Sequence, residues 1–265
     1  MIMVAELLEI PASFRDSEYA VFKSFFPRSL LREYLRFLEH ALDKEVWPVY
    51  RRLGLDPQDS ELPTHVARLL ANQQLDPAEK QLLLGHFPLS VRLSDAIKPV
   101  AQFMGASPLL KALLHTDTLH MHMPPMARFV PPRYQSAAVP PHQDISYNTH
   151  IAEFLVVWAP LVPIDHQCGG LVMYRGGHQQ VHQVANADNG WLSPIDVSTY
   201  ERHPLVGLDL GDAVVFSPRV VHASAPNTST RTRFSLDMRL FGAATRSAKH
   251  HMNLDTLEVI NTATA

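Results

Sequence analysis

The sequence is poor in cysteine, in long apolar runs and in excess charge of either sign. Cys168 is the single cysteine among 265 residues, so no internal disulfide can form and we expect a reducing, cytoplasmic setting. No uninterrupted apolar segment approaches the roughly 20 residues of a membrane-spanning helix, and the N-terminus lacks the basic and apolar regions of a secretory signal. The formal net charge of -3 supplies no basic surface for nucleic acid or an anionic membrane. We therefore expect neither nucleic acid nor a membrane as a partner.

The residues that are abundant indicate one folded domain with two kinds of secondary structure. Apolar residues make up 46% of the chain, which is enough for one sizeable core. The 21 prolines become frequent from residue 124 onward, where they would interrupt helices. We predict a single domain over 1–265, with mostly helical support in 1–115, a strand-rich core in 116–245 and a C-terminal tail in 246–265.

The first 115 residues show the apolar periodicity of helices. One stripe follows Ser29, which can cap the helix, and it comprises Leu30, Leu31, Tyr34, Leu35, Leu38 and Leu42. Asp76 before a proline predicts a second helix over Pro77–Gly85. Two further helices are expected after Ser94 and Ser107, whose hydroxyls can accept a hydrogen bond from a helix N–H.

From about residue 117 the pattern changes to short strands without helical segments between them. The predicted strands are Thr118–Met123, Phe154–Trp158, Gly170–Tyr174, Ala213–Phe216 and Phe234–Leu240. This pattern favours an antiparallel sandwich or barrel over a parallel sheet. The polar stretch 179–204 is predicted to be a long loop, of the kind that often forms a lid or a binding segment.

The segment His142-Gln143-Asp144 is a candidate half of a metal site. On a strand, residues two apart project to the same face, so the imidazole and the carboxylate could reach one point while Gln143 faces outward. In a chain with 15 histidines, however, such a pair is more often an ordinary surface feature. The pair needs a third ligand before it becomes informative.

A second motif lies far downstream, in residues 211–235. A Gly211-Asp212 turn precedes an apolar strand, His222 follows, and Arg233 comes 11 residues after that histidine. Two histidines and one carboxylate on one face of a metal form the facial triad of non-haem Fe(II) oxygenases. An arginine set back from the metal could hold the far carboxylate of 2-oxoglutarate through paired, charge-assisted hydrogen bonds.

At these residues the sequence resembles the phytanoyl-CoA dioxygenase family of Fe(II)/2-oxoglutarate-dependent oxygenases. The matching segments follow the family's order and are His142–Asp144, Trp158–Leu161, Gly169–His178, Gly211–Asn227 and Arg233–Ser235. The third segment departs from the family's usual Pro-Gly-Ser-His turn, because it reads Arg175-Gly176-Gly177-His178 here. Residues 1–115 carry no matching motif.

The resemblance implies a fold, a metal and a co-substrate. The fold would be mainly β with flanking α-helices: a double-stranded β-helix, or cupin-like jelly roll, supported by the N-terminal helices. The implied iron ligands are His142, Asp144 and His222. Arg233 and Ser224 would bind 2-oxoglutarate, and Trp158 would lie beside it. The implied cofactors are Fe(II), with 2-oxoglutarate and O2 as co-substrates.

Several assignments have a competing interpretation. Arg231 shares its strand parity with Arg233, but the spacing and the hydroxyl of Ser235, which could share the carboxylate, favour Arg233 as the anchor. His120 and His122 form another same-face pair that could line a substrate cavity, or could simply be buried and hydrogen-bonded. Arg175 could meet an anionic substrate, although an arginine at a loop tip is more often solvated.

The predicted function is oxidation of an unactivated C–H bond of a small molecule, normally hydroxylation in secondary metabolism, with release of succinate and CO2. A carboxylate at position 144 argues against halogen transfer, because halogenating relatives have a small residue there. Epimerisation, cyclisation or desaturation by the same cofactors stays open, as does a non-catalytic cupin-like metal-binding module. The histidines and arginines around the site slightly favour a polar or anionic substrate, and the sequence does not indicate an oligomeric state.

Overall fold

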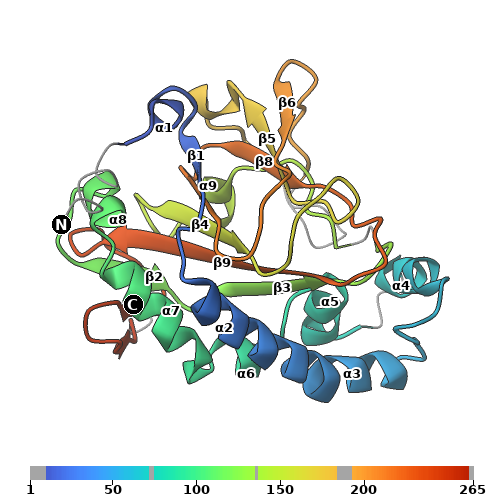
Figure 1. The fold of residues 1–265 in the computed structure, drawn as a ribbon. Helices are drawn as coiled ribbons and strands as arrows, with labels where there is room; N and C mark the ends of the chain where they lie inside the picture. Colours follow the sequence, from blue (N-terminus) through green and yellow to red (C-terminus); the bar gives the residue numbers. More distant parts are fainter. Residues whose placement is uncertain (1–9, 72–74, 135–136, 184–192, 263–265) are drawn as a thin grey trace.

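The fold consists of two antiparallel β-sheets that face each other, with most of the helices packed on one side (Figure 1). A computed structural model describes residues 10–71, 75–134, 137–183 and 193–262. The middle of the predicted loop at 179–204 therefore lies outside the described residues.

The larger sheet has the strand order β1-β7-β4-β9-β2-β10-β11, with β3 also paired to β9. Its strands are β1 (Tyr19–Phe22), β2 (Leu119–His122), β3 (Met126–Val130), β4 (Leu155–Pro160), β7 (Ala213–Phe216), β9 (Arg233–Gly242), β10 (His251–Asn253) and β11 (Val259–Ile260). The smaller sheet has the order β6-β5-β8 and contains β5 (Leu171–Arg175), β6 (Glu201–Pro204) and β8 (Val221–Ser224). All of these strand pairings are antiparallel. The core is thus the predicted jelly roll.

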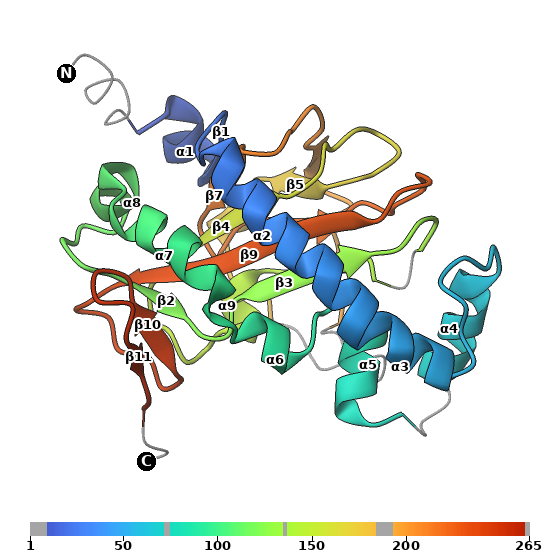
Figure 2. The ribbon, with the colours of Figure 1, turned by 60° about the horizontal axis from the view of Figure 1, so that its bottom comes forward.

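Most of the helices cover the outer face of the larger sheet, where α2 crosses β9 and α7 lies against β2 (Figure 2). The helical segments are α1 (Ala12–Ser17), α2 (Arg28–Ala41), η1 (Leu42–Val46), α3 (Trp47–Arg52), α4 (Leu62–Ala71), α5 (Pro77–Leu83), α6 (Leu89–Arg92), η2 (Asp95–Ile97), α7 (Lys98–Gly105), α8 (Pro108–Leu113), α9 (Asp144–Tyr147) and η3 (Gly177–Gln179). None of the described helices combines the length and apolarity needed to cross a bilayer.

Long strand β9 separates two apolar layers because its side chains alternate between the two faces of the sheet. Phe234, Leu236 and Met238 belong to the core that packs against the helices, together with Leu31 and Leu38 of α2. Phe241 belongs to the second core, which fills part of the space between the sheets. The residues of β9 on this second face are therefore available to line a site inside the sandwich.

The predicted helix starts were largely confirmed. Asp76 caps α5 in a capping box with Glu79, and the side chains of Ser94 and Ser107 accept hydrogen bonds from Ala96 N and Leu110 N. The prediction for Ser29 was wrong: α2 begins at Arg28, so Ser29 lies inside the helix, and the helix N-terminus has no side-chain cap. The missing cap has a simple cause, since Pro27 occupies the capping position and has no side-chain acceptor.

Both ends of the chain contribute strands that the sequence did not predict. In the predicted helical region, β1 pairs with β7 at an edge of the larger sheet. The segment 246–265 is not merely a tail, because β10 pairs with β2 and β11 pairs with β10. Covering β2 in this way satisfies backbone groups that would otherwise be left at a sheet edge. The stretch 179–204, predicted as a loop, ends in β6.

Candidate functional site

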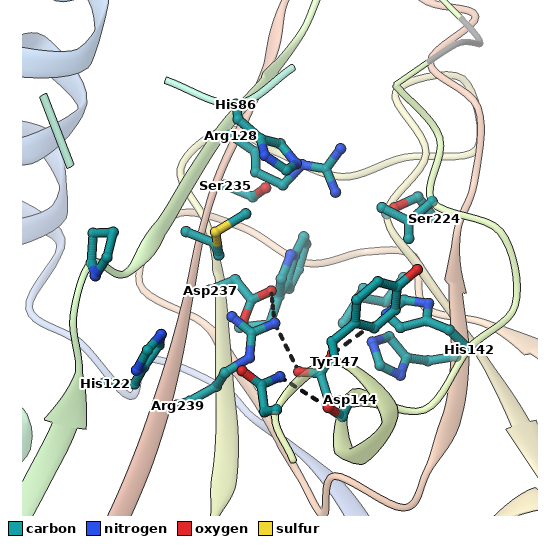
Figure 3. A pocket seen from close by; sticks show the side chains of 18 of the residues that line it. His86, His122, Arg128, His142, Asp144, Tyr147, Ser224, Ser235, Asp237 and Arg239 are labelled. Atoms are coloured by element: carbon teal, nitrogen blue, oxygen red, sulfur yellow. Dashed lines mark hydrogen bonds and ion pairs between the residues drawn. The ribbon is translucent and has the colours of Figure 1, made fainter. Parts of the chain in front are cut away.

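A cavity of about 290 Å³ opens between the two sheets and is lined by residues of both (Figure 3). Strand β8 of the smaller sheet contributes His222 and Ser224. The segment before α9 contributes His142, and α9 itself begins with Asp144. Strand β9 of the larger sheet contributes four residues at alternate positions, Arg233, Ser235, Asp237 and Arg239.

His142, Asp144 and His222 come together on one side of this cavity. Each offers one ligand atom, and these atoms lie within 4.8 Å of one another. All three residues are buried. The backbone fixes the two histidines opposite each other, since His142 N donates to His222 O at 2.9 Å and His222 N donates to His142 O at 2.9 Å. Among the described residues, this is the group of histidines and carboxylates whose geometry suits a shared metal ion.

The orientation of the two imidazoles suits metal binding. Nδ1 of His142 lies 2.8 Å from Pro140 O, and Nδ1 of His222 lies 3.0 Å from Val220 O. A carbonyl oxygen can only accept, so each Nδ1 carries a hydrogen, and in the neutral imidazole the lone pair is then on Nε2. Nε2 of His142 lies 3.4 Å from Oδ1 of Asp144. Two such nitrogens and one carboxylate oxygen are the donor set of a facial triad, and the carbonyl contacts are the outer support that ligating histidines normally have.

The local backbone differs from the prediction that His142 and Asp144 share a strand face. Gln143 is extended, but Asp144 begins the short helix α9, and this turn brings its carboxylate to the histidines. Gln143 is fully buried rather than outward. Its amide nitrogen donates to the carbonyls of Gly177, Gln180 and Arg219, and its oxygen accepts from His182 N. Gln143 therefore ties the ligand segment to the turn after β5 and to the turn before β8.

Burial and the neighbouring charges keep Asp144 and His222 in their metal-binding forms. Burial opposes ionisation of Asp144, but the Arg239 guanidinium, 3.0 Å away, and the two histidines outweigh it and hold the pKa of this carboxyl well below its usual range. Burial, aided by the neighbouring His142, lowers the pKa of His222 to about 3. At neutral pH the site thus presents an ionised carboxylate and a neutral His222.

Arg233 lies in the cavity with unused hydrogen-bonding capacity. It is only 4% exposed, and its Nη1 donates to Ala225 O at 2.9 Å. Within the described part of the chain, its buried Nε has no hydrogen-bond partner. Burial lowers the pKa of Arg233 to about 10, so the side chain remains a cation at neutral pH. A buried guanidinium with an unsatisfied donor suits an anionic ligand.

The other candidate residues divide between those inside the cavity and those outside it. Trp158, Ser224, Ser235 and His122 line the cavity. His120 does not belong to the lining and stacks on His251, with ring centroids 5.0 Å apart.

The two competing arginines also lie outside the cavity. Arg231 pairs with Asp165 at 2.7 Å, and Arg175 contacts Tyr19 and Glu201. Neither residue belongs to the cavity lining. Arg233 is therefore the arginine that the fold delivers to the site.

Besides Arg128 on β3, sequence reasoning missed two charged residues of the site on β9, Asp237 and Arg239. Arg239 bridges the two carboxylates, because its Nη2 lies 3.0 Å from Asp144 Oδ2 and 3.5 Å from Asp237 Oδ2 (Figure 3). Strand parity could have found both, since they continue the alternation that starts at Arg233.

Comparison with known proteins agrees with this geometry. The profile of the phytanoyl-CoA dioxygenase (PhyH) family matches residues 19–235, which include the triad, Arg233 and most of both sheets. The chain belongs to the phytanoyl-CoA dioxygenase family. A curated relative, 1-deoxypentalenic acid 11-beta-hydroxylase from Streptomyces exfoliatus, is 28% identical over 118 residues. That match covers 40% of this chain and about two-fifths, 41%, of the hydroxylase.

Solved structures share the fold of this family member. The epimerase SnoN from nogalamycin biosynthesis has a TM-score of 0.57 at 17% identity, over 91% of this chain and 83% of its own. EvdO2 from Micromonospora carbonacea var. aurantiaca, solved with 2-oxoglutarate, has a TM-score of 0.54 at 22% identity, over 90% of this chain and 93% of its own. At these identities the likeness establishes the jelly-roll fold, and the chemistry has to be argued from the site.

Proposed function

We propose that this protein is an Fe(II)/2-oxoglutarate-dependent oxygenase that oxidises a C–H bond of a small molecule and releases succinate and CO2. The observation that carries the proposal is the combination in one cavity of the His142, Asp144 and His222 donor set with the buried, incompletely bonded Arg233. A metal site with only a structural role would not need a buried cation beside it. Membership of the PhyH family supports the same conclusion.

The residues at the opposite end of the cavity from Asp144 suit a dicarboxylate. Arg128 and Arg233 lie on the paired strands β3 and β9, with Ser235 directly across from Arg128. Figure 3 shows Arg128, His86 and Ser235 grouped at this end. We assign the far carboxylate of 2-oxoglutarate to Arg233, with the hydroxyls of Ser224 and Ser235 nearby, and its 2-oxo acid group to the metal held by the triad.

The bound metal supplies the oxidising chemistry by activating dioxygen together with the 2-oxo acid. The protein holds the ligands, orients the co-substrate and keeps the reacting C–H bond close to the metal. The triad is enclosed between two sheets, which limits access of water to the reaction. Asp144 stays ionised through Arg239, so the third ligand is ready to bind at neutral pH.

The experiment that tests this proposal is anaerobic addition of Fe(II) and 2-oxoglutarate to the purified protein. We expect the weak visible charge-transfer band of the chelate. Metal binding without this band would rule out the proposal and would favour a non-catalytic cupin-like module.

The outcome of the reaction can be separated from the cofactor requirement. A panel of candidate metabolites should be screened aerobically for succinate and for a mass gain of one oxygen atom in the product. Hydroxylation gives both signals. Succinate with an unchanged or reduced product mass would instead indicate epimerisation, cyclisation or desaturation.

The ligand assignment gives a direct mutational prediction. His142→Ala and Asp144→Ala should each abolish the charge-transfer band and reduce succinate formation by at least about a hundredfold, because each removes a metal ligand. Glu201→Gln, a change to an exposed side chain outside the cavity, should leave both signals near the wild-type level. Near wild-type activity in both ligand variants would show that the ligands are other residues.

A further inference from the structure

A second carboxylate, Asp237, lies beside the candidate metal centre without belonging to it. One nitrogen of Arg239 contacts both Asp144 and Asp237, so the two carboxylates are only a few ångströms apart. Figure 3 shows Asp237 and Arg239 together on the wall of the cavity. A ligand group bound by Asp237 would therefore lie close to the metal, where the reacting part of a substrate has to be.

Asp237 has hydrogen-bonding capacity that the described residues do not use. Its Oδ1 is buried and has no hydrogen-bond partner among them. The side chain still exposes 19% of its surface and lines the cavity, so a ligand can reach it. Burial raises the pKa of Asp237 to about 6, partly opposed by Arg239 and reinforced by Asp144. An incompletely bonded buried carboxylate is unfavourable, and a ligand that donates a hydrogen bond would relieve it.

Besides Arg239, Asp237 has two largely apolar neighbours across the paired strands. Asp237 lies directly opposite Met126 on β3 and directly opposite Trp158 on β4. Directly opposed residues of paired strands point to the same face, and all three line the cavity. Asp237 is therefore a single hydrogen-bond acceptor between a thioether and an indole, a surface that suits an apolar ring carrying one donor group.

The surrounding charges select a neutral donor. An ammonium group at Asp237 would face Arg239 beside it, in a cavity that also holds Arg128, Arg233 and the proposed metal. A carboxylate or phosphate would face Asp144 and Asp237. A hydroxyl group can donate to Asp237 without adding charge of either sign.

We propose that Asp237 is a substrate-binding residue and that the substrate is a neutral, ring-containing molecule whose hydroxyl group donates a hydrogen bond to Asp237 while its ring packs against Met126 and Trp158. The proposal rests on the proposed function and narrows its substrate class. Of the two expected substrate types, polar or anionic, it keeps the polar one, because Asp237 places a second negative group beside Asp144.

The test uses four ring probes that differ in one group: cyclohexanol, cyclohexyl methyl ether, cyclohexylammonium and cyclohexanecarboxylate. Each is added to the anaerobic full-length protein with 2-oxoglutarate and a substoichiometric amount of Mn(II), a paramagnetic substitute for Fe(II). Line broadening of the probe's proton NMR signals then reports how much probe lies near the metal, and His142→Ala provides the background. We expect cyclohexanol to bind about tenfold more tightly than each of the other probes, the size of effect expected for a hydrogen bond to a charged group.

Substitutions at Asp237 give a change of preference that a purely structural residue would not give. In Asp237→Leu the alcohol should lose its advantage over the ether, and binding of the carboxylate probe should rise several-fold, because Arg239 loses one of its two carboxylate partners. Asp237→Asn keeps the shape and one acceptor, so it should retain part of the preference. Glu201→Leu, outside the cavity, is the matched control and should rank the probes as the wild type does.

The 2-oxoglutarate signals separate failure of this inference from failure of the proposed function. If Mn(II) broadens them in the wild type and not in His142→Ala, the co-substrate lies at the triad and the probe ranking is a valid test. The inference is then overturned if the wild type prefers the ammonium or the carboxylate probe, or if Asp237→Leu keeps the preference for the alcohol. Absence of 2-oxoglutarate broadening would overturn the proposed function and this inference with it.

Discussion

At the scale of single residues, the site depends on side chains that use one polar atom for a hydrogen bond within the protein and leave another available to a ligand. The histidines of the triad use Nδ1 for backbone carbonyls and leave Nε2 for a metal. Arg233 follows the same rule, with Nη1 on Ala225 O and Nε unpaired within the described residues. A side chain held in this way can bind a ligand without first breaking a hydrogen bond or changing its rotamer.

Arg233 allows a specific prediction about the co-substrate. Arg233→Lys should raise the KM for 2-oxoglutarate about tenfold, because a point charge replaces a planar fork, and Arg233→Ala should raise it further. The measurement is succinate formation against 2-oxoglutarate concentration, together with anaerobic titration of the charge-transfer band. Arg231→Ala is the control, since Arg231 pairs with Asp165 outside the cavity, and its KM should stay within about threefold of the wild type. Equal effects at both positions would contradict the assignment of Arg233.

Functional residues could be predicted from the sequence where they belong to a recognisable motif. They were missed where their role arises only from contacts in the folded structure. The two motifs and the family resemblance that they carry implied His142, Asp144 and His222 as ligands, and the fold brings these three residues together. Strand parity alone could place Asp237 and Arg239 on the face of β9 that carries Arg233, but their role depends on the contacts of the Arg239 guanidinium with Asp144 and Asp237, which only the fold creates. The same reason explains Gln143, whose burial depends on turns far away in the chain.

At the scale of elements, one turn fastens the N-terminal region to the jelly roll. Gly211 has a φ of +104°, a conformation that glycine adopts readily, and its carbonyl accepts from Phe26 N at 2.8 Å. Asp212 follows and is buried. It accepts hydrogen bonds from Ser24 N at 2.9 Å, Asp209 N at 2.8 Å and Lys23 Nζ at 2.5 Å. The turn before β7 thus holds the chain between β1 and α2.

Asp212→Asn should therefore lower the free energy of unfolding at neutral pH by about 1–3 kcal/mol, mainly through the backbone hydrogen bonds, because Lys23 is exposed. Burial alone would raise the pKa of Asp212. Hydrogen bonds from Lys23 and from the backbone N–H groups of Ser24 and Asp209 outweigh burial and lower this pKa. A lowered pKa means that this stabilisation is present above the unfolded-state value, about 3.9, and is lost as pH falls through the folded-state value.

Urea denaturation of the wild type and Asp212→Asn between pH 7 and pH 3 measures this effect. The difference in unfolding free energy should be constant near neutral pH and should shrink below about pH 4. A difference that does not change with pH would mean that the charge of Asp212 has no part in it. Glu201→Gln should differ from the wild type by less than about 0.5 kcal/mol at neutral pH, because Glu201 is exposed.

Elements were predictable where the sequence carries a strong local signal. Strand β7 was predicted with its exact bounds, and α5 was identified by its capping residue and proline. The missed strands β1, β3, β6, β8, β10 and β11 have five residues or fewer, and their sequences show no clear apolar alternation. Their pairing partners, rather than their own sequences, make them strands.

At the scale of the whole molecule, the proposed metal centre connects the two sheets. His222 lies on the smaller sheet, while Arg239, which holds Asp144, lies on the larger one. Ligands that bind only the folded state raise its stability by mass action. We therefore expect Mn(II) to raise the melting temperature by a few degrees, and Mn(II) with 2-oxoglutarate to raise it further.

The rise in melting temperature with Mn(II) and 2-oxoglutarate together should exceed the sum of the rises with each ligand alone. The reason is that 2-oxoglutarate has its full set of contacts only when the metal is present. Thermal denaturation followed by circular dichroism, with and without a chelator, is the measurement. His142→Ala should lose the metal-dependent shift. A shift of equal size in His142→Ala would place the stabilising metal elsewhere.

Strand β9 has a consequence for how this protein can change by insertion, deletion or substitution. Its odd-numbered residues from Arg233 to Arg239 line the cavity, and its even-numbered residues from Phe234 to Met238 pack under the helices. Inserting or deleting one residue here would exchange the two sets and destroy the cavity and the core together. A single substitution at position 237, by contrast, leaves the register, Arg233 and the triad in place. Laboratory evolution of new substrate preferences should therefore vary position 237 by substitution and keep the length of β9 constant.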